Sequence, residues 1–281
     1  MKMYLDPKMD FIFKKILSDE DVLLDFVRSA LSKTEGNIVS VKIVNPETKR
    51  EFIEDKYSIL DVRAVTEDGR IINIEIQRKD EKNMGERSLF HWSKLYSEQI
   101  SLGDSYRKLK KTICINILDF NYTDEEHFHS IYILKELERN NPLQGAPLEI
   151  HFIELKKFEK HAGLATEEGL SDWIEFLNAP NTVEEKKNPS IKKALQTLET
   201  LSLDKETREL YKLRKDAQDE GRRQLNSKFD EGLEEGFEQG REQVRFEVIK
   251  NSLLAGLTLE TISSITGASL TEIQSVKNSL T

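Results

Sequence analysis

The spacing of apolar residues near the start of the chain predicts two short helices. Apolar side chains recur every three or four residues between Phe11 and Leu31, which is the period of one face of an α-helix. The pattern breaks at a polar run, where Ser18 or Asp19 could cap the second helix. We therefore expect two amphipathic helices, each burying one face.

A series of β-rich runs follows these helices. The strand candidates are residues 38–44, 57–65, 71–77, 112–118, 130–134 and 148–155. Helical spacing returns between residues 86 and 102, before Gly103. The run 112–118 is apolar almost throughout, which is typical of a strand covered on both faces. Helices and strands in this order predict an α/β or α+β domain that ends near Pro180.

Strand signals are absent from the charged region 181–246. Its helical pattern contains four glycines: Gly232, Gly236 and Gly240 are spaced by four residues, and Gly221 lies eleven residues before Gly232. A glycine inside a helix costs about 1 kcal/mol relative to alanine, so helix stability does not explain them. We interpret them as a stripe where two helices approach closely, which would make the protein a homo-oligomer. A solvated connector helix is the alternative.

Residues 247–281 have the pattern of three short helices in a small C-terminal module. Thr258, Gly267 and Ser269 stand where helix caps are expected. Helix–turn–helix DNA readers share this rhythm, but the segment has too few basic residues for phosphate binding. We expect a packing or partner-binding module.

Composition adds limits to this picture. The 281 residues carry 42 Lys and Arg against 51 Asp and Glu, a net charge of −9. This balance disfavours nucleic-acid binding over the whole surface but allows a local basic cleft. The single cysteine, Cys114, excludes an internal disulfide framework, and no run reaches the ~18 apolar residues of a membrane span. We expect a soluble cytoplasmic protein that does not associate with membranes.

The stretch 61–77 has the pattern of a β-hairpin. Its two β runs flank Glu67-Asp68-Gly69, and a three-residue loop ending in glycine suits a type I turn followed by a left-handed residue. The pairs that this register predicts are Ala64 with Ile72, Arg63 with Asn73, Val62 with Ile74, and Asp61 with Glu75. The register collects the apolar side chains on one face and the polar side chains on the other.

The polar face of this hairpin brings together two carboxylates, Asp61 and Glu75, with Gln77 beside them. Directly opposed carboxylates repel each other, and a bound divalent cation would reverse that cost. Such oxygen ligands suit Mg²⁺. An ordinary amphipathic hairpin with a solvated acidic face explains the same pattern, and the pattern alone favours it.

Asp61, Glu75 and Gln77 resemble the core motif of PD-(D/E)XK nucleases. The chain as a whole resembles the Rpn family of recombination-promoting nucleases, a group of transposase-like proteins, over essentially its full length. Besides the glycine-spaced tail, the matching segments are residues 10–14, 74–78, 86–87, 96–99, 103–106, 115–118 and 265–267. The resemblance implies an α/β fold with a nuclease-like mixed central sheet flanked by helices in residues 1–180. Regions 181–246 and 247–281 would form an all-helical C-terminal extension.

The resemblance also implies a Mg²⁺-dependent DNA endonuclease linked to recombination or transposition, with Mn²⁺ as a substitute ion. Asp61, Glu75 and the main-chain carbonyl of Ile76 would bind the metal, which activates a water for phosphodiester hydrolysis. Gln77 stands where the wider superfamily has lysine, and its amide can orient water but carries no charge. Asp10 is either a further acidic catalytic residue or a helix N-cap.

Several basic and aromatic residues are candidates for contacts with DNA. They are Lys94, Tyr96, Lys108, Lys110 and Lys111. The first two follow the hairpin on a helix, and the three lysines belong to the most basic run of the first half. Arg87 lies on the same helix face as Lys94, and a solvated position is the better interpretation for it.

His127 and His129 have the spacing of metal ligands on a strand. Without a third ligand, two surface histidines are the better interpretation. Cys114 is expected to be buried.

One rival to the nuclease remains open. It is a DNA-binding or regulatory interaction protein that keeps the fold with little catalysis. Gln77 and the net charge favour this rival, and the carboxylate pair favours the enzyme.

Overall fold

The computed structural model describes residues 4–44, 62–80, 82–161, 168–183 and 188–280. The chain divides into two compact units, residues 1–211 and residues 212–281. Over these described ranges, no helix is both long enough and apolar enough to span a bilayer.

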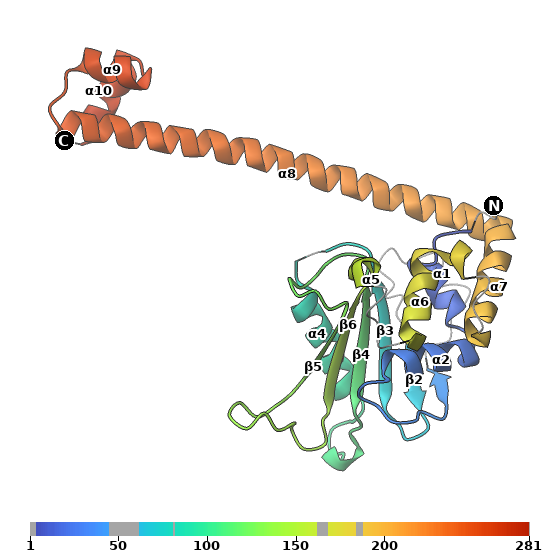
Figure 1. The fold of residues 1–281 in the computed structure, drawn as a ribbon. Coiled ribbons are helices and arrows are strands. Elements are labelled where there is room, and N and C mark those ends of the chain that lie inside the picture. Colours follow the sequence, from blue (N-terminus) through green and yellow to red (C-terminus); the bar gives the residue numbers. More distant parts are fainter. Residues whose placement is uncertain (1–3, 45–61, 81, 162–167, 184–187, 281) are drawn as a thin grey trace. The chain divides into compact units, whose positions relative to one another are not determined.

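The first unit is built on a mixed sheet of six strands in the order β1-β2-β3-β4-β6-β5 (Figure 1). The strands are β1 (Val41–Ile43), β2 (Val62–Thr66), β3 (Ile71–Gln77), β4 (Thr112–Leu118), β5 (His129–Ile133) and β6 (Leu148–Glu154). β3, β4 and β6 are parallel to one another, and the outer pairs are antiparallel. The mixed central sheet expected from the sequence is therefore confirmed.

Helices flank this sheet on both faces. They are α1 (Asp10–Ile16), α2 (Glu20–Ala30), α4 (Met84–Ser97), α5 (Leu155–His161), α6 (Glu168–Asn178) and α7 (Pro189–Leu203), with short 3₁₀ turns η1 (Tyr106–Lys108) and η2 (Pro180–Thr182). Helices α1, α2, α6 and α7 pack together over one face, and α4 packs on the other. Of the two cap candidates, Asp19 caps α2 by accepting from the main-chain N–H groups of Asp21 and Val22.

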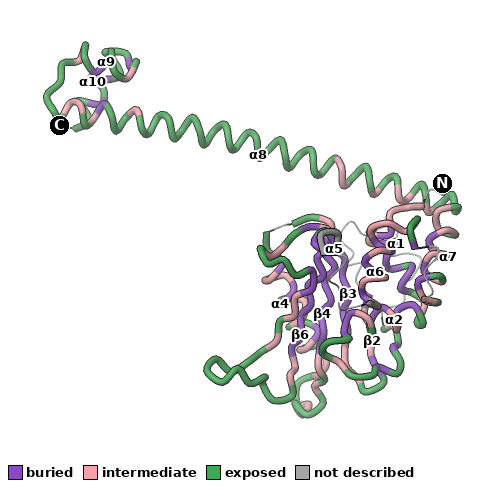
Figure 2. Tube along the Cα trace, viewed as in Figure 1, coloured by how far each residue is buried: buried purple, intermediate pink, exposed green. Residues whose placement is uncertain are grey.

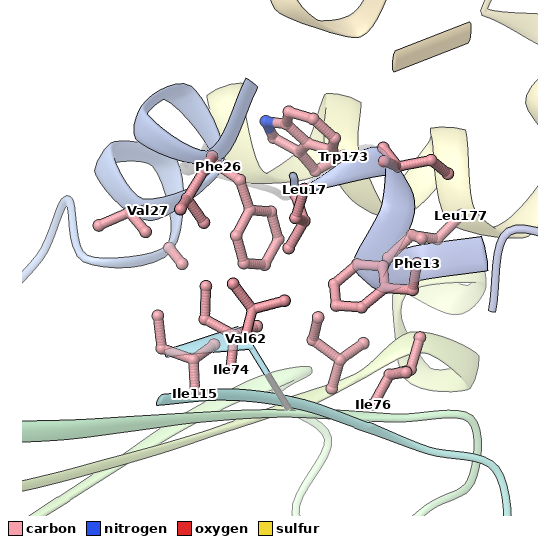
Figure 3. Close-up of a cluster of buried hydrophobic side chains, with 14 of the residues drawn as sticks. Phe13, Leu17, Phe26, Val27, Val62, Ile74, Ile76, Ile115, Trp173 and Leu177 are labelled. Atoms are coloured by element: carbon pink, nitrogen blue, oxygen red, sulfur yellow. The ribbon is translucent and has the colours of Figure 1, made fainter. Parts of the chain in front are cut away.

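The larger core lies between the sheet and the group of helices that contains α1, α2 and α6 (Figure 3). Trp173 of α6 is completely buried there, and its ring centroid lies 5.4 Å from that of Phe26 in α2. The Trp173 indole N–H donates to Asp25 over 2.9 Å. Strand side chains such as Ile74 and Ile115 close the core from below. Together these contacts join α2 and α6 to the sheet.

Strand β4 is buried along all seven residues, as its sequence predicts (Figure 2). Its odd-numbered isoleucines belong to the larger core, whereas Cys114 and Leu118 belong to a second apolar cluster with Met84 and Leu95 of α4. Cys114 is therefore buried, as expected.

The predicted hairpin register is confirmed wherever the structure describes it. The observed partners are Ala64 with Ile72, Arg63 with Asn73, and Val62 with Ile74. Gly69 has a φ of 88°, in the left-handed region that the turn requires. Asp61 lies outside the described residues, so its pairing with Glu75 stays a prediction.

The second unit contains most of α8 (Lys205–Leu254), then α9 (Leu259–Thr266) and α10 (Leu270–Ser279). Thr258 and Ser269 cap α9 and α10, and Gly267 ends α9 with a φ of 67°, as predicted. The first of the three expected short helices is wrong: its residues form the end of α8. α8 runs through its glycines without a break and ends at Leu254, shortly before Gly256, whose φ is 78°.

Candidate active site

Glu75 is the centre of the candidate site. It lies near the carboxyl end of β3, beside Asn116 of β4. Because side chains alternate along a strand, Glu75 points to the α4 face while Ile74 and Ile76 point into the larger core. Glu75 is only 7% exposed, so its charge needs a partner.

Two neighbouring side chains supply that partner. The amide nitrogen of Gln77 donates to Oε1 of Glu75 over 2.5 Å. A guanidinium nitrogen of Arg87 donates to the same oxygen, also over 2.5 Å. The two-residue spacing of β3 places Gln77 on the same face as Glu75, and the early turns of α4 bring Arg87 above them.

Arg87 is the site residue that sequence reasoning missed. Its expected position on a solvated helix face is wrong, because its side chain is only 31% exposed and ion-paired to Glu75. The sequence contained one usable signal: Arg87 belongs to a segment, Glu86–Arg87, that matches the resembling family. The helical spacing placed Arg87 and Lys94 on one face and could not show which of them meets Glu75.

Three buried polar atoms between β3 and α4 have no hydrogen-bond partner in the described part of the chain. They are Oδ1 of Asn73, Nε of Arg87 and Oγ of Ser88. A buried polar group without a partner costs about 1–3 kcal/mol, so these atoms mark a place where water or a ligand is needed.

The residues here fit a hard divalent cation in the type of their donors. Glu75 offers carboxylate oxygens, and Gln77 offers an amide oxygen, which are ligands that Mg²⁺ accepts. Within the described ranges no three His, Cys, Asp or Glu side chains gather into a metal-binding group. Asp61, the second carboxylate predicted from the sequence, lies outside the described residues, so its place in the site stays a prediction.

The remaining predicted catalytic and metal residues take different positions. The side chain of Ile76 is buried in the larger core, which leaves its main-chain carbonyl as the only group for a metal. Asp10 is the first residue of α1 and follows the N-cap residue Met9, so the N-cap interpretation is wrong by one residue. Its carboxylate accepts from the N–H of Phe11 over 2.8 Å.

Lys94 and Tyr96 lie on α4, as predicted, but their neighbours are residues other than Glu75. Lys94 is half-exposed and lies 3.9 Å from a carboxylate oxygen of Glu98, one turn later. The ring of Tyr96 stacks on Trp92 with centroids 5.0 Å apart. Lys94 thus remains accessible from solvent, whereas Tyr96 supports the helix surface.

The three lysines before β4 lie at the other end of the strands. Thr112, the first residue of β4, pairs with Ile71 at the start of β3, while Glu75 lies near the end. Lys108 forms an ion pair with Asp104, and Lys111 is held between Glu35 and Glu149. The main-chain N–H of Lys110 donates to Gln99 over 2.7 Å. The structure does not join this basic run to Glu75.

Lys111 is the partly exposed end of a polar network on the opposite face of the sheet from Glu75, and the other members of the network are buried. The network runs from Lys111 through Glu149 and His151 to His129. His129 is therefore buried, which contradicts the expected pair of surface histidines, whereas His127 is exposed. Strands β5 and β6 bring these imidazoles together, and spacing within one strand could not show this.

The protonation states of Glu149 and His151 follow from their contacts. Glu149 accepts from His151 over 2.6 Å and from Lys111 over 2.5 Å. Burial by itself would raise the pKa of Glu149, but hydrogen bonds from His151, Lys111 and Thr34 outweigh it and lower the pKa to about 2. Burial lowers the pKa of His151. A neutral His151 that donates to Glu149 through Nε2 must accept from His129 through Nδ1.

Comparison with protein-family models gives a match over residues 7–227, to the family described as PD-(D/E)XK nuclease family transposase. The matched range contains the whole sheet, the hairpin, α4 and the first part of α8. No curated protein and no solved structure matches the chain.

Proposed function

Because the chain belongs to the PD-(D/E)XK nuclease family of transposases, we propose that it is a Mg²⁺-dependent DNA endonuclease that acts in recombination or transposition. The observation that supports this most is the buried carboxylate of Glu75 on the polar face of the hairpin, with Gln77 two residues later. Family membership itself indicates a nuclease, and the metal, the DNA substrate and the process are the proposal.

In this proposal Asp61, Glu75 and the main-chain carbonyl of Ile76 hold the divalent cation, with Mn²⁺ as a substitute. When bound, the ion lowers the pKa of a coordinated water and stabilises charge on the phosphate oxygens. Gln77 donates its N–H to Glu75 and keeps an amide oxygen that can orient the attacking water. Asp10 is the further acidic residue proposed for this site.

The proposed DNA contacts divide into two groups. Lys94 and Tyr96 lie on α4, the same helix as Arg87, and would contact a DNA duplex bound at the site. Lys108, Lys110 and Lys111 precede β4, where a duplex would reach them only by extending along the sheet. Because Lys111 is partly buried and paired with two carboxylates, Lys108 and Lys110 are the more accessible of these three.

A plasmid-nicking assay with Mg²⁺ tests the proposed active site. We expect Asp61→Ala and Glu75→Ala to lower the cleavage rate by roughly 10²-fold or more, because both remove a metal ligand. Glu138→Ala is the matched control, since this glutamate is exposed in the loop after β5. Equal cleavage by all four proteins would refute the assignment, as would Mg²⁺ affinity that neither substitution changes.

A second candidate function is a regulatory protein that binds DNA without cutting it. The ion pair between Arg87 and Glu75 favours it, because the buried carboxylate is already neutralised without a metal. Such a protein would bind a duplex equally well in EDTA and in Mg²⁺. The nuclease should instead need the divalent ion both for tight binding and for cleavage.

We also propose that residues 1–180 form the nuclease domain.

A separate proposal is that α8 joins two copies of the chain. A Cβ added at Gly232, Gly236 or Gly240 would meet no atom from elsewhere in the described chain within 4 Å. Four large apolar side chains of α8 repeat with the same spacing and stay exposed: Leu225, Phe229, Leu233 and Phe237. Residues spaced by four lie along one side of a helix and shift only slightly around it from turn to turn. A second copy of α8 would cover this side.

A further inference from the structure

Arg87 is a permanent positive charge beside Glu75. Gln77 also contacts Glu75, but its amide carries no charge. Arg87 places a permanent cation on the same oxygen of Glu75 that Gln77 contacts, with both distances 2.5 Å. The site therefore contains the charge that Gln77 lacks, supplied from α4 instead of β3.

Arg87 also has donors left over. A guanidinium has five N–H groups, and its Nε is buried without a hydrogen-bond partner in the described part of the chain. Its side chain is 31% exposed overall, so solvent reaches part of the side chain, although Nε itself is buried. A planar cation with unused donors beside a partly open surface is suited to a phosphate, which arginine can bind through two parallel hydrogen bonds.

We propose that Arg87 is the cation that this site offers to a DNA phosphate, and that Arg87 and a divalent metal ion compete for Glu75. The proposal rests on the nuclease function proposed above. Without metal, Arg87 neutralises Glu75. With a divalent ion on the carboxylate, Arg87 would be free to turn toward the phosphodiester, where its charge would meet the negative charge that develops during hydrolysis.

Competition for Glu75 can be measured without DNA. We expect Arg87→Gln to raise the affinity for Mn²⁺, followed by calorimetric titration, by roughly tenfold, because a unit positive charge a few ångströms from the ion is removed. Arg139→Gln is the matched control, since this arginine is exposed in the loop after β5. Thermal unfolding followed by circular dichroism shows whether each variant is folded. A Mn²⁺ affinity equal to that of the wild type in a folded Arg87→Gln protein would overturn the proposal.

The phosphate contact is tested by binding a short fluorescent duplex in Ca²⁺. We expect Arg87→Gln to weaken binding by roughly tenfold and, in Mg²⁺, to slow cleavage by roughly 10²-fold. Arg87→Lys should recover part of both. The double variant Gln77→Lys/Arg87→Gln should bind the duplex more tightly and cleave faster than Arg87→Gln does, because it returns one cation to the side of Glu75. A purely structural role for Arg87 would give no such rescue, and unchanged duplex binding in Arg87→Gln would overturn the contact.

These readouts separate the two proposals. A wild-type protein that never cleaves, but whose Mn²⁺ affinity rises in Arg87→Gln, refutes the nuclease and supports the competition. A wild-type protein that cleaves, but whose Arg87→Gln variant binds metal and DNA unchanged, supports the nuclease and refutes the role of Arg87.

Discussion

A single residue, Gly69, sets the geometry of the hairpin turn. Gly69 adopts a φ of 88°, which residues with a Cβ rarely reach. A Cβ at this position would also lie 3.4 Å from the side chain of Lys110. The glycine therefore fixes the turn, and the turn fixes which residues of β2 face those of β3.

We expect Gly69→Ala to lower the free energy of unfolding by about 1–2 kcal/mol, because alanine is strained in the left-handed region. Urea denaturation measures the change. Gly36→Ala is the matched control, since Gly36 has no neighbour within 4 Å of an added Cβ and no positive φ. A loss of the same size in both variants would show that backbone strain is not the cause.

Glu149 makes the stability of the protein depend on pH. Its pKa of about 2 lies below the ordinary value of 4.5, so the folded protein binds this proton more weakly than the unfolded chain does. The stabilisation is complete above the ordinary value and is lost as pH falls toward 2. The lowered pKa of His151 acts in the same direction, with losses beginning below 6.5.

We therefore expect Glu149→Gln to lower the free energy of unfolding at pH 7 by about 3 kcal/mol and to flatten its fall between pH 5 and pH 3. Urea denaturation across this pH range measures both effects. Glu138→Gln, at an exposed position, should keep the wild-type pH dependence. An equally steep acid loss in Glu149→Gln would contradict the assignment.

The packing of α2 against α6 depends on one large side chain, Trp173. Trp173 is fully buried, donates to Asp25, and lies edge-on to Phe26 in α2 and to Phe176 in its own helix. Gly169 approaches Ser29 so closely that an added Cβ would lie 2.7 Å from its hydroxyl. The two helices are thus joined by one large side chain and one close approach.

We expect Trp173→Ala to lower the free energy of unfolding by about 3–5 kcal/mol, the range for emptying a buried aromatic position. Leu102→Ala, at a fully exposed leucine, should change it by less than about 0.5 kcal/mol. Urea denaturation distinguishes the two. Comparable small losses in both would contradict the central position of Trp173 in this core.

The elements also show where sequence reasoning succeeds and where it ends. The bounds of β3 and β4 and the hairpin register follow from alternation, from a continuous apolar run and from turn chemistry, which are all local. Arg87 and His129 were misplaced because their partners come from other elements, and no spacing within one helix or strand records such a contact. Thus Glu75 and Gln77 could be predicted as neighbours, but the cation that neutralises Glu75 could not.

At the scale of the whole molecule, the stripe on α8 predicts assembly. We expect Gly232→Leu with Gly236→Leu to dissociate the oligomer in light scattering, because leucine keeps the two helices apart. The substitution favours helix, so a lost helix would not explain dissociation. Glu234→Leu with Glu238→Leu is the matched control, on the side of α8 opposite these glycines. A wild-type protein that is already monomeric at micromolar concentration would contradict the assembly.

The parallel pairing of β3, β4 and β6 has a kinetic consequence. These strands are neighbours in the sheet but are separated along the chain by α4 and by the segment 119–147. Parallel neighbours pair only after the intervening chain has been ordered, so loop-closure entropy slows refolding. Trp92 donates to the carbonyl oxygen of Thr112 at the start of β4 and lies on the other side of the sheet from Trp173. In variants that keep only one tryptophan, the change in fluorescence during refolding would therefore report how fast the helices pack on one face of the sheet, separately for each face.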